Sequence, residues 1–132
     1  MRAVLDTNVL VSALLSPGKT CHQLIQQAVV DRVEVCYSTA IMAEYLHVLS
    51  RASFAFDPVA VDALLDWIER DGLLVQPAAV PLLADPSDTK FMEAAVGAGA
   101  LYLVTGNLKH FPPSPFLGVK ILAPAEFLKL GL

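Results

Sequence analysis

The sequence predicts a three-layer α/β/α fold with a central parallel sheet, on the basis of three observations. Short apolar segments typical of strands alternate with longer segments of helical periodicity along the chain. The strand segments are apolar throughout, which indicates burial on both faces, as in a parallel sheet covered by helices. With 132 residues, of which 55% are hydrophobic, the chain can bury one sizeable core. We therefore expect residues 1–132 to form a single domain.

The first part of the chain predicts two strands and three helices. In order, they are a strand at 3–6, helices at 8–16 and 20–31, a strand at 33–38 and a helix at 39–51. Pro17 and Gly18 end the first helix, and the β-branched and aromatic residues of VEVCYS mark the second strand.

The second part continues the alternation. In order, it predicts a helix at 57–72, a strand at 73–77, a helix at 85–100, strands at 101–106 and 119–122, and a helix at 123–131. Asp57 and Pro58 supply an N-cap and a proline at the first helical position, and Gly72 ends that helix.

Composition narrows the functional classes. A net charge of −4 argues against a broad basic face for nucleic acid, so any such function must use few basic residues or added cations. Cys21 and Cys36 stand in no metal-ligand spacing and are expected to be free, buried or partly buried thiols. The longest apolar stretch, at 94–104, is too short to cross a bilayer, and the first residues lack the pattern of a signal peptide. We therefore expect a cytoplasmic protein.

Asp6 ends the first predicted strand. In a parallel α/β sheet, ligands bind outside the carboxyl ends of the strands, near the point where the strand order reverses, so Asp6 is a candidate site residue. A second interpretation is that Asp6, Thr7 or Asn8 caps the following helix, because all three residue types are favoured there.

Glu44 lies in the predicted helix at 39–51. A helical wheel places an apolar arc on one side of this helix, formed by Ile41, Met42, Tyr45, Leu46, Val48 and Leu49. Glu44 falls at the edge of this arc, where its charge would be partly desolvated and would need a cation or hydrogen-bond donors. Alternatively, Glu44 reaches water or pairs with a basic residue.

Asp85 and Asp88 open the predicted helix at 85–100. Asp85 is followed by Pro86 and suits an N-cap, and Asp88 would then face the positive end of the helix. The wheel nevertheless places Asp88 on the inward side with Phe91 and Met92, which makes it the better ligand candidate.

Four segments together resemble a known family. They are VLDTNVLVSALLS, YSTAIMAEYLHVLSR, DPSDTKFMEAAVGAGALYLVTGN and LKHF, in this order and spacing. In these segments the chain resembles the PIN-domain nucleases of the PilT N-terminal type, particularly the bacterial proteins classed as toxin components of toxin–antitoxin pairs and related to the VapC toxins.

The resemblance implies a parallel α/β sheet whose crevice gathers acids around Mg²⁺ or Mn²⁺ for the cleavage of RNA. It assigns the acids to Asp6, Glu44 and Asp88, with Asn107 at a fourth position that usually holds Asp. This departure removes one negative charge, although an amide oxygen can still bind a hard cation. Further candidates that orient the ligands or contact substrate are Thr7, Asn8, Asp85, Thr105 and Lys109. A toxin role implies a cognate antitoxin, and the apolar excess favours a homodimer.

Other functional classes are open to different degrees. The chain is either a metal-dependent ribonuclease or, because of Asn107, a catalytically weak or inactive module of the same fold that binds nucleic acid or protein. A receiver-type signalling domain would need an acidic pair after the first strand, where the sequence reads LDTN. Nucleophilic hydrolases lack support because there is no G-x-S-x-G motif and neither cysteine has a neighbouring histidine.

Overall fold

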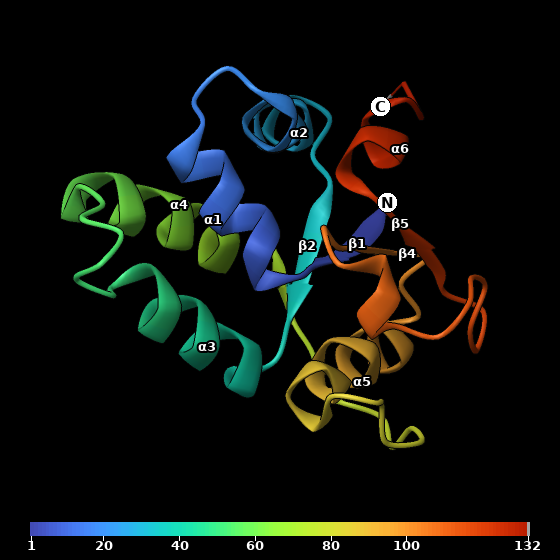
Figure 1. The fold of residues 1–132 in the computed structure, drawn as a ribbon. Coiled ribbons are helices and arrows are strands. Elements are labelled where there is room, and N and C mark those ends of the chain that lie inside the picture. The colour runs from blue at the N-terminus through green and yellow to red at the C-terminus, as the bar shows by residue number, and fades with distance from the viewer. Residues whose placement is uncertain (132) are drawn as a thin grey trace.

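A sheet of five parallel strands forms the centre of the computed structural model, which describes residues 1–131 (Figure 1). The strands are β1 (Arg2–Leu5), β2 (Glu34–Tyr37), β3 (Leu73–Leu74), β4 (Tyr102–Val104) and β5 (Lys120–Leu122). Their order across the sheet is β3-β2-β1-β4-β5, and each neighbouring pair is parallel. The predicted α/β class is therefore confirmed.

Helices cover both faces of the sheet. They are α1 (Thr7–Leu15), α2 (Thr20–Val30), α3 (Thr39–Leu49), α4 (Pro58–Asp71), α5 (Thr89–Ala98) and α6 (Pro124–Leu128). Helix α5 packs against β1, β2 and β4, whereas α2 packs against α1 and α6, and Figure 1 shows α5 below the strands and α2 and α6 above them. Among residues 1–131, no helix combines the length and the apolar character that a bilayer crossing requires.

The strand order creates a switch point between β1 and β4. From β1 the chain first adds β2 and β3 on one side, and later adds β4 and β5 on the other. The register aligns Leu5 with Val104, and the backbone N–H of Asp6 donates to the Val104 carbonyl at 2.9 Å. The residues that follow these strands, Asp6 and Thr105, therefore lie together where this architecture places its ligands.

The buried core fixes the helices that carry the site. Ile41, Tyr45 and Leu49 form a stripe at four-residue spacing that faces inward from α3, and Phe91 is fully buried on α5. Complete burial of a side chain such as Phe91 contributes about 1.5–3 kcal/mol. The Tyr45 hydroxyl also donates to the Leu5 carbonyl, which ties α3 to the end of β1.

Three details differ from the sequence prediction. Leu46, predicted to lie on the buried arc, is 53% exposed because α3 buries a narrower stripe. The predicted strand at 73–77 is short because the chain turns towards α5, where the Ala78 N–H donates to the Glu93 carbonyl. The helix predicted from residue 85 begins with a 3₁₀ turn, Pro86–Asp88, which the side chain of Asp85 caps.

Both cysteines are free thiols, as predicted. Cys36 is buried in β2, where burial raises its pKa to about 11, and Cys21 is partly buried on α2.

Candidate active site at the carboxyl end of the sheet

Asp6 is a buried carboxylate held by neutral donors. It is 6% exposed, and its Oδ2 accepts hydrogen bonds from Thr105 Oγ1 at 2.8 Å and from Asn8 Nδ2 at 3.3 Å. Asp6 stands at the N-cap position of α1, yet its side chain makes no capping hydrogen bond within the described chain. Helix capping therefore does not explain why this position carries an acid.

The loop after β4 is tied to the loop after β1. Thr105 Oγ1 accepts the backbone N–H of Asn107 at 2.9 Å, and Asn8 Oδ1 accepts the backbone N–H of Gly106 at 3.0 Å. The first bond is local, whereas the second connects residues 98 positions apart in the sequence. They fix the backbone of Asn107 beside Asp6, while Asn107 itself is exposed.

Glu44 projects from the second turn of α3 and contacts two other helices. Its Oε2 accepts a short hydrogen bond from Thr7 Oγ1 on α1, and its Oε1 lies 2.7 Å from Lys90 Nζ on α5. The side chains of Glu44 and Lys90 are 26% and 21% exposed, respectively. The partial desolvation predicted for Glu44 is thus offset by a hydroxyl donor and a cationic side chain.

Three carboxylates influence one another electrostatically. Burial raises the pKa of Asp6 to about 6, the Thr105 hydrogen bond opposes this rise, and the charges of Asp88 and Glu44 add to it. Burial also raises the pKa of Asp88, as do the charges of Asp85 and Glu44. The charges of Asp88 and Glu44 thus both act on Asp6, and the charge of Glu44 also acts on Asp88.

Asp88 carries the unpaired oxygen of this region. Its Oδ2 is buried and has no hydrogen-bond partner among the described residues, although His110 Nδ1 lies 3.4 Å away as an ion-pair contact. Buried anionic oxygens are normally satisfied by donors or by a cation. The arrangement therefore suits an additional positive partner at Asp88.

Within residues 1–131, one group of three side chains lies close enough together to bind a single metal ion. It consists of Asp85, Asp88 and His110, whose ligand atoms all lie within 4.8 Å of one another. Asp6 and Glu44 fall outside this group, so Asp88 is the residue common to it and to the predicted acids. The carboxylates of this group suit Mg²⁺ and Mn²⁺, which prefer oxygen donors, whereas its imidazole nitrogen is more typical of Fe, Ni, Cu and Zn.

The other predicted residues lie around these acids. Asp85 is exposed, and its Oδ1 accepts from the Ser87 N–H at 3.0 Å and from Ser87 Oγ at 2.8 Å, which lowers the pKa of Asp85. Lys109 is exposed on the 3₁₀ turn η2 (Leu108–His110) that follows Asn107. His110, on the same turn, is not among the residues predicted for the site; its position shortly after the end of a predicted strand was the available signal.

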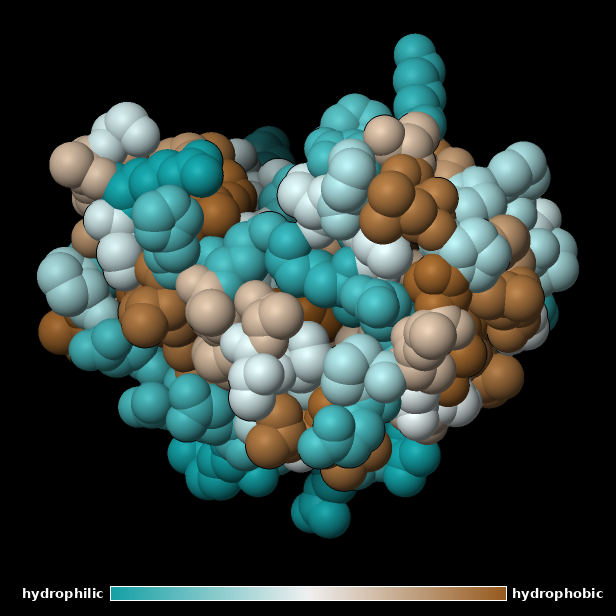
Figure 2. Space-filling model, turned by 90° about the horizontal axis from the view of Figure 1, so that it is seen from below, coloured by the Kyte–Doolittle hydropathy of each residue, from teal (hydrophilic) through white to brown (hydrophobic). Residues whose placement is uncertain are grey.

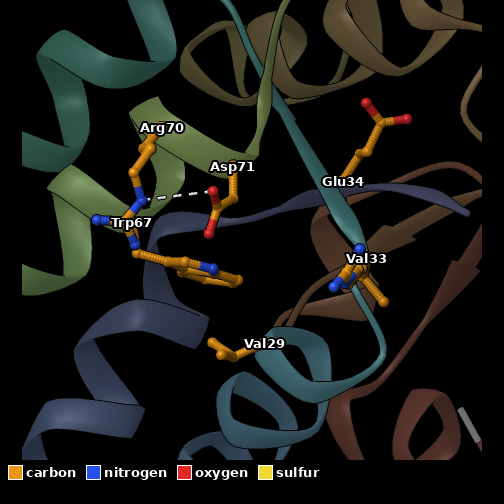
Figure 3. A pocket seen from close by; sticks show the side chains of 7 residues that line it. Val29, Val33, Glu34, Trp67, Arg70 and Asp71 are labelled. Atoms are coloured by element: carbon orange, nitrogen blue, oxygen red, sulfur yellow. Dashed lines mark hydrogen bonds and ion pairs between the residues drawn. The ribbon is translucent and has the colours of Figure 1, made fainter.

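A separate cavity lies at the opposite end of the sheet. It has a volume of about 520 Å³ and is lined by residues at the end of α2, the start of β2 and the end of α4 (Figure 3). Trp67 forms one wall, and Arg70 pairs with Asp71 across 3.4 Å. Because the strands are parallel, the start of β2 is remote from their carboxyl ends, so this cavity is separate from the acids.

Comparison with known proteins identifies a family. A model of the PIN domain matches residues 2–109, and this range contains Asp6, Glu44, Asp88 and Asn107. No curated protein matches the chain.

Proposed function

Because this chain belongs to the PIN-domain family, whose members are generally metal-dependent nucleases, we propose that it is an endoribonuclease that hydrolyses RNA phosphodiester bonds with a divalent metal. The observation that carries this proposal is the buried Asp88 oxygen without a hydrogen-bond partner, whose carboxylate lies in one group of possible metal ligands with Asp85 and His110, near the carboxyl end of the sheet. Such a cluster is unfavourable without a cation, and a bound cation can attract a phosphate.

Asp6, Glu44 and Asp88 are the proposed ligands of Mg²⁺ or Mn²⁺, with Asn107 as a neutral fourth ligand. Mg²⁺ commonly binds through one or two carboxylates and keeps several waters, so a sparse, open set of acids suits it. When bound, the metal would act as a Lewis acid on the phosphodiester and lower the pKa of the attacking water. Asp85 and His110 extend the donor set around Asp88.

The neighbouring polar side chains would hold the ligands in place. Thr105 and Asn8 fix the orientation of the Asp6 carboxylate, and Thr7 does the same for Glu44. Hydrogen bonds of this kind typically tune the ligands of a metal site. Lys90, beside Glu44, and the exposed Lys109 would provide positive charge for the RNA backbone, in keeping with the small number of basic residues.

We also propose a biological setting for this activity. The resemblance to VapC-related proteins supports a role as the toxin of a toxin–antitoxin pair, with a separate cognate antitoxin and a homodimeric toxin. Large hydrophobic residues with more than half of their surface exposed, such as Leu46, Val59, Leu82 and Leu101, offer area for such contacts. Co-expression with the product of the neighbouring reading frame, followed by co-purification and sizing, tests these partners.

A cleavage assay tests the central proposal. The full chain is incubated with single-stranded and structured RNA in Mn²⁺, Mg²⁺ or EDTA, beside Asp88→Asn and the matched control Asp66→Asn, an exposed acid on α4. We expect metal-dependent cleavage by the parent and the control and a loss of at least about a hundredfold in Asp88→Asn. A parent that neither cleaves RNA nor binds Mn²⁺ in calorimetry would instead indicate a non-catalytic binding module.

A further inference from the structure

An apolar groove lies directly beside the candidate active site. It has a volume of about 310 Å³ and runs between the loop at 81–84 and the loop at 109–116. Figure 2 shows hydrophobic side chains gathered on the right-hand side of the face seen from below, the side on which the loop at 112–119 lies in Figure 1. The volume is near the lower end of the range of about 300–1,000 Å³ that is typical of small-ligand sites.

The groove is continuous with the acids. His110 lines it and also belongs to the group formed with Asp85 and Asp88. Its Nδ1 lies 3.4 Å from Asp88 Oδ2. Only the side chain of His110 therefore separates the groove from the proposed ligand Asp88. A substrate whose phosphate meets Asp88 would therefore place a neighbouring group in the groove.

The lining has the chemistry of a stacking platform. Phe116 and Pro112 come from one segment, Pro81 and Leu82 come from the other, and Phe111 also lines the groove but is only 7% exposed; the described lining residues include no carboxylate. Phe116 is partly buried and Leu82 is 74% exposed, so the two sides form an open slot. Flat apolar surfaces of this kind suit the face of an unpaired base, because bases in single-stranded RNA commonly stack on aromatic side chains.

The charge of the rim complements a nucleotide. Lys109, which is exposed, places an ammonium group among the residues that line the groove, next to the imidazole of His110, in a chain whose net charge is −4. An apolar slot with a cationic rim fits an aromatic base attached to an anionic phosphate. A wholly apolar protein segment would make no use of Lys109.

We propose that this groove is the subsite for one unpaired nucleobase of the RNA, next to the phosphodiester that is cleaved. This inference rests on the proposed nuclease function and adds to it a place for one base beside the bond that is cleaved. Selectivity would come from stacking and from the width of the slot.

Binding of modified oligonucleotides tests the subsite. Fluorescence anisotropy measures the affinity of the full chain, in Mn²⁺, for a single-stranded phosphorothioate RNA and for a series in which one base at a time is removed. We expect one abasic position to weaken binding about tenfold, in line with the typical contribution of a base–aromatic stack. Leu82→Ser and Phe116→Ala should remove most of that difference, whereas Phe54→Ala, a partly buried phenylalanine in the loop between α3 and α4, should retain it.

The outcomes separate this inference from the proposal on which it rests. Leu82 is highly exposed, so Leu82→Ser tests the groove even if Phe116→Ala fails to fold. If the protein cleaves RNA with metal but no abasic position weakens binding, the subsite is wrong and the nuclease proposal stands. The same holds if the groove variants bind every oligonucleotide as the parent does. The groove would then serve another occupant, such as a protein segment. Absence of RNA binding by the parent would overturn both.

Discussion

Replacement of Asp6 by asparagine should stabilise the metal-free protein at neutral pH. Asp6 is buried, and the groups that hold it are the neutral donors Thr105 and Asn8, while Glu44 and Asp88 add like charge nearby. An asparagine side chain has almost the same volume and keeps an oxygen that can accept from Thr105. The substitution therefore removes an unfavourable charge without opening a cavity.

The raised pKa of Asp6 sets the size and the pH range of this effect. The folded protein holds the Asp6 proton up to about pH 6, whereas the ordinary carboxyl pKa is 3.8. Between these values the folded state binds more protons than the unfolded state, so the free energy of unfolding falls as pH rises. The loss is complete above about pH 6 and amounts to about 3 kcal/mol. Asp6→Asn should escape this loss, so its advantage appears between pH 4 and pH 6 and persists at higher pH.

Urea unfolding in EDTA at pH values from 4 to 8 measures the difference. Asp66→Asn is the matched control, because Asp66 is an exposed acid on α4. Added Mn²⁺ should stabilise the parent through binding to the folded state and should affect Asp6→Asn much less. A variant no more stable than the parent at pH 7.5, or an advantage that does not change with pH, would refute the proposed cost of the Asp6 charge.

Three further predictions concern the same region. Mn²⁺ affinity, measured by calorimetry, should rise with pH up to about 6 and then level off, because Asp6, as a proposed ligand, must lose its proton before it can bind a cation; a pH-independent affinity would contradict this. Tyr45→Phe should lower the free energy of unfolding in urea by about 1–2 kcal/mol, because it leaves the buried Leu5 carbonyl without its donor; an unchanged urea midpoint would contradict it. Gly97→Ala should lower the thermal midpoint by several degrees, because its Cβ would lie 2.1 Å from the Gln76 carbonyl oxygen; an unchanged midpoint would show that the loop yields easily.

The architecture was predictable because it follows from local patterns of apolar and polar residues along the chain. Each predicted strand and helix has a counterpart in the structure, and burial of apolar runs on both faces dictates a parallel sheet between helix layers. Such a sheet gathers the carboxyl ends of its strands along one edge. That topology places Asp6 and Thr105 together, although 99 positions separate them in the sequence.

The detailed contacts of the site were not predictable, because they depend on distances between helices that are far apart in the sequence. The Thr7–Glu44 hydrogen bond and the Glu44–Lys90 ion pair each join two helices whose relative positions follow from the packed core. The group of Asp85, Asp88 and His110 arises because a side-chain cap forms a 3₁₀ turn before α5 and brings it beside η2. Leu46 is exposed although it lies on the predicted apolar arc of α3. A helical wheel gives the direction of a side chain but does not show whether another element covers it.

Asp6, Glu44 and Asp88 differ in the groups that offset their negative charge. This difference predicts which of them a cation would face. Glu44 has the Lys90 ammonium at 2.7 Å, Asp88 has the more distant imidazole of His110, and Asp6 has neutral donors. A cation placed among them would gain least by replacing Lys90 and most by facing Asp6 and the unpaired Asp88 oxygen. Lys90 also donates to the Ser87 carbonyl, so it would stay beside Glu44 when a cation faces Asp6 and Asp88, and its ammonium would remain a positive charge next to the acids.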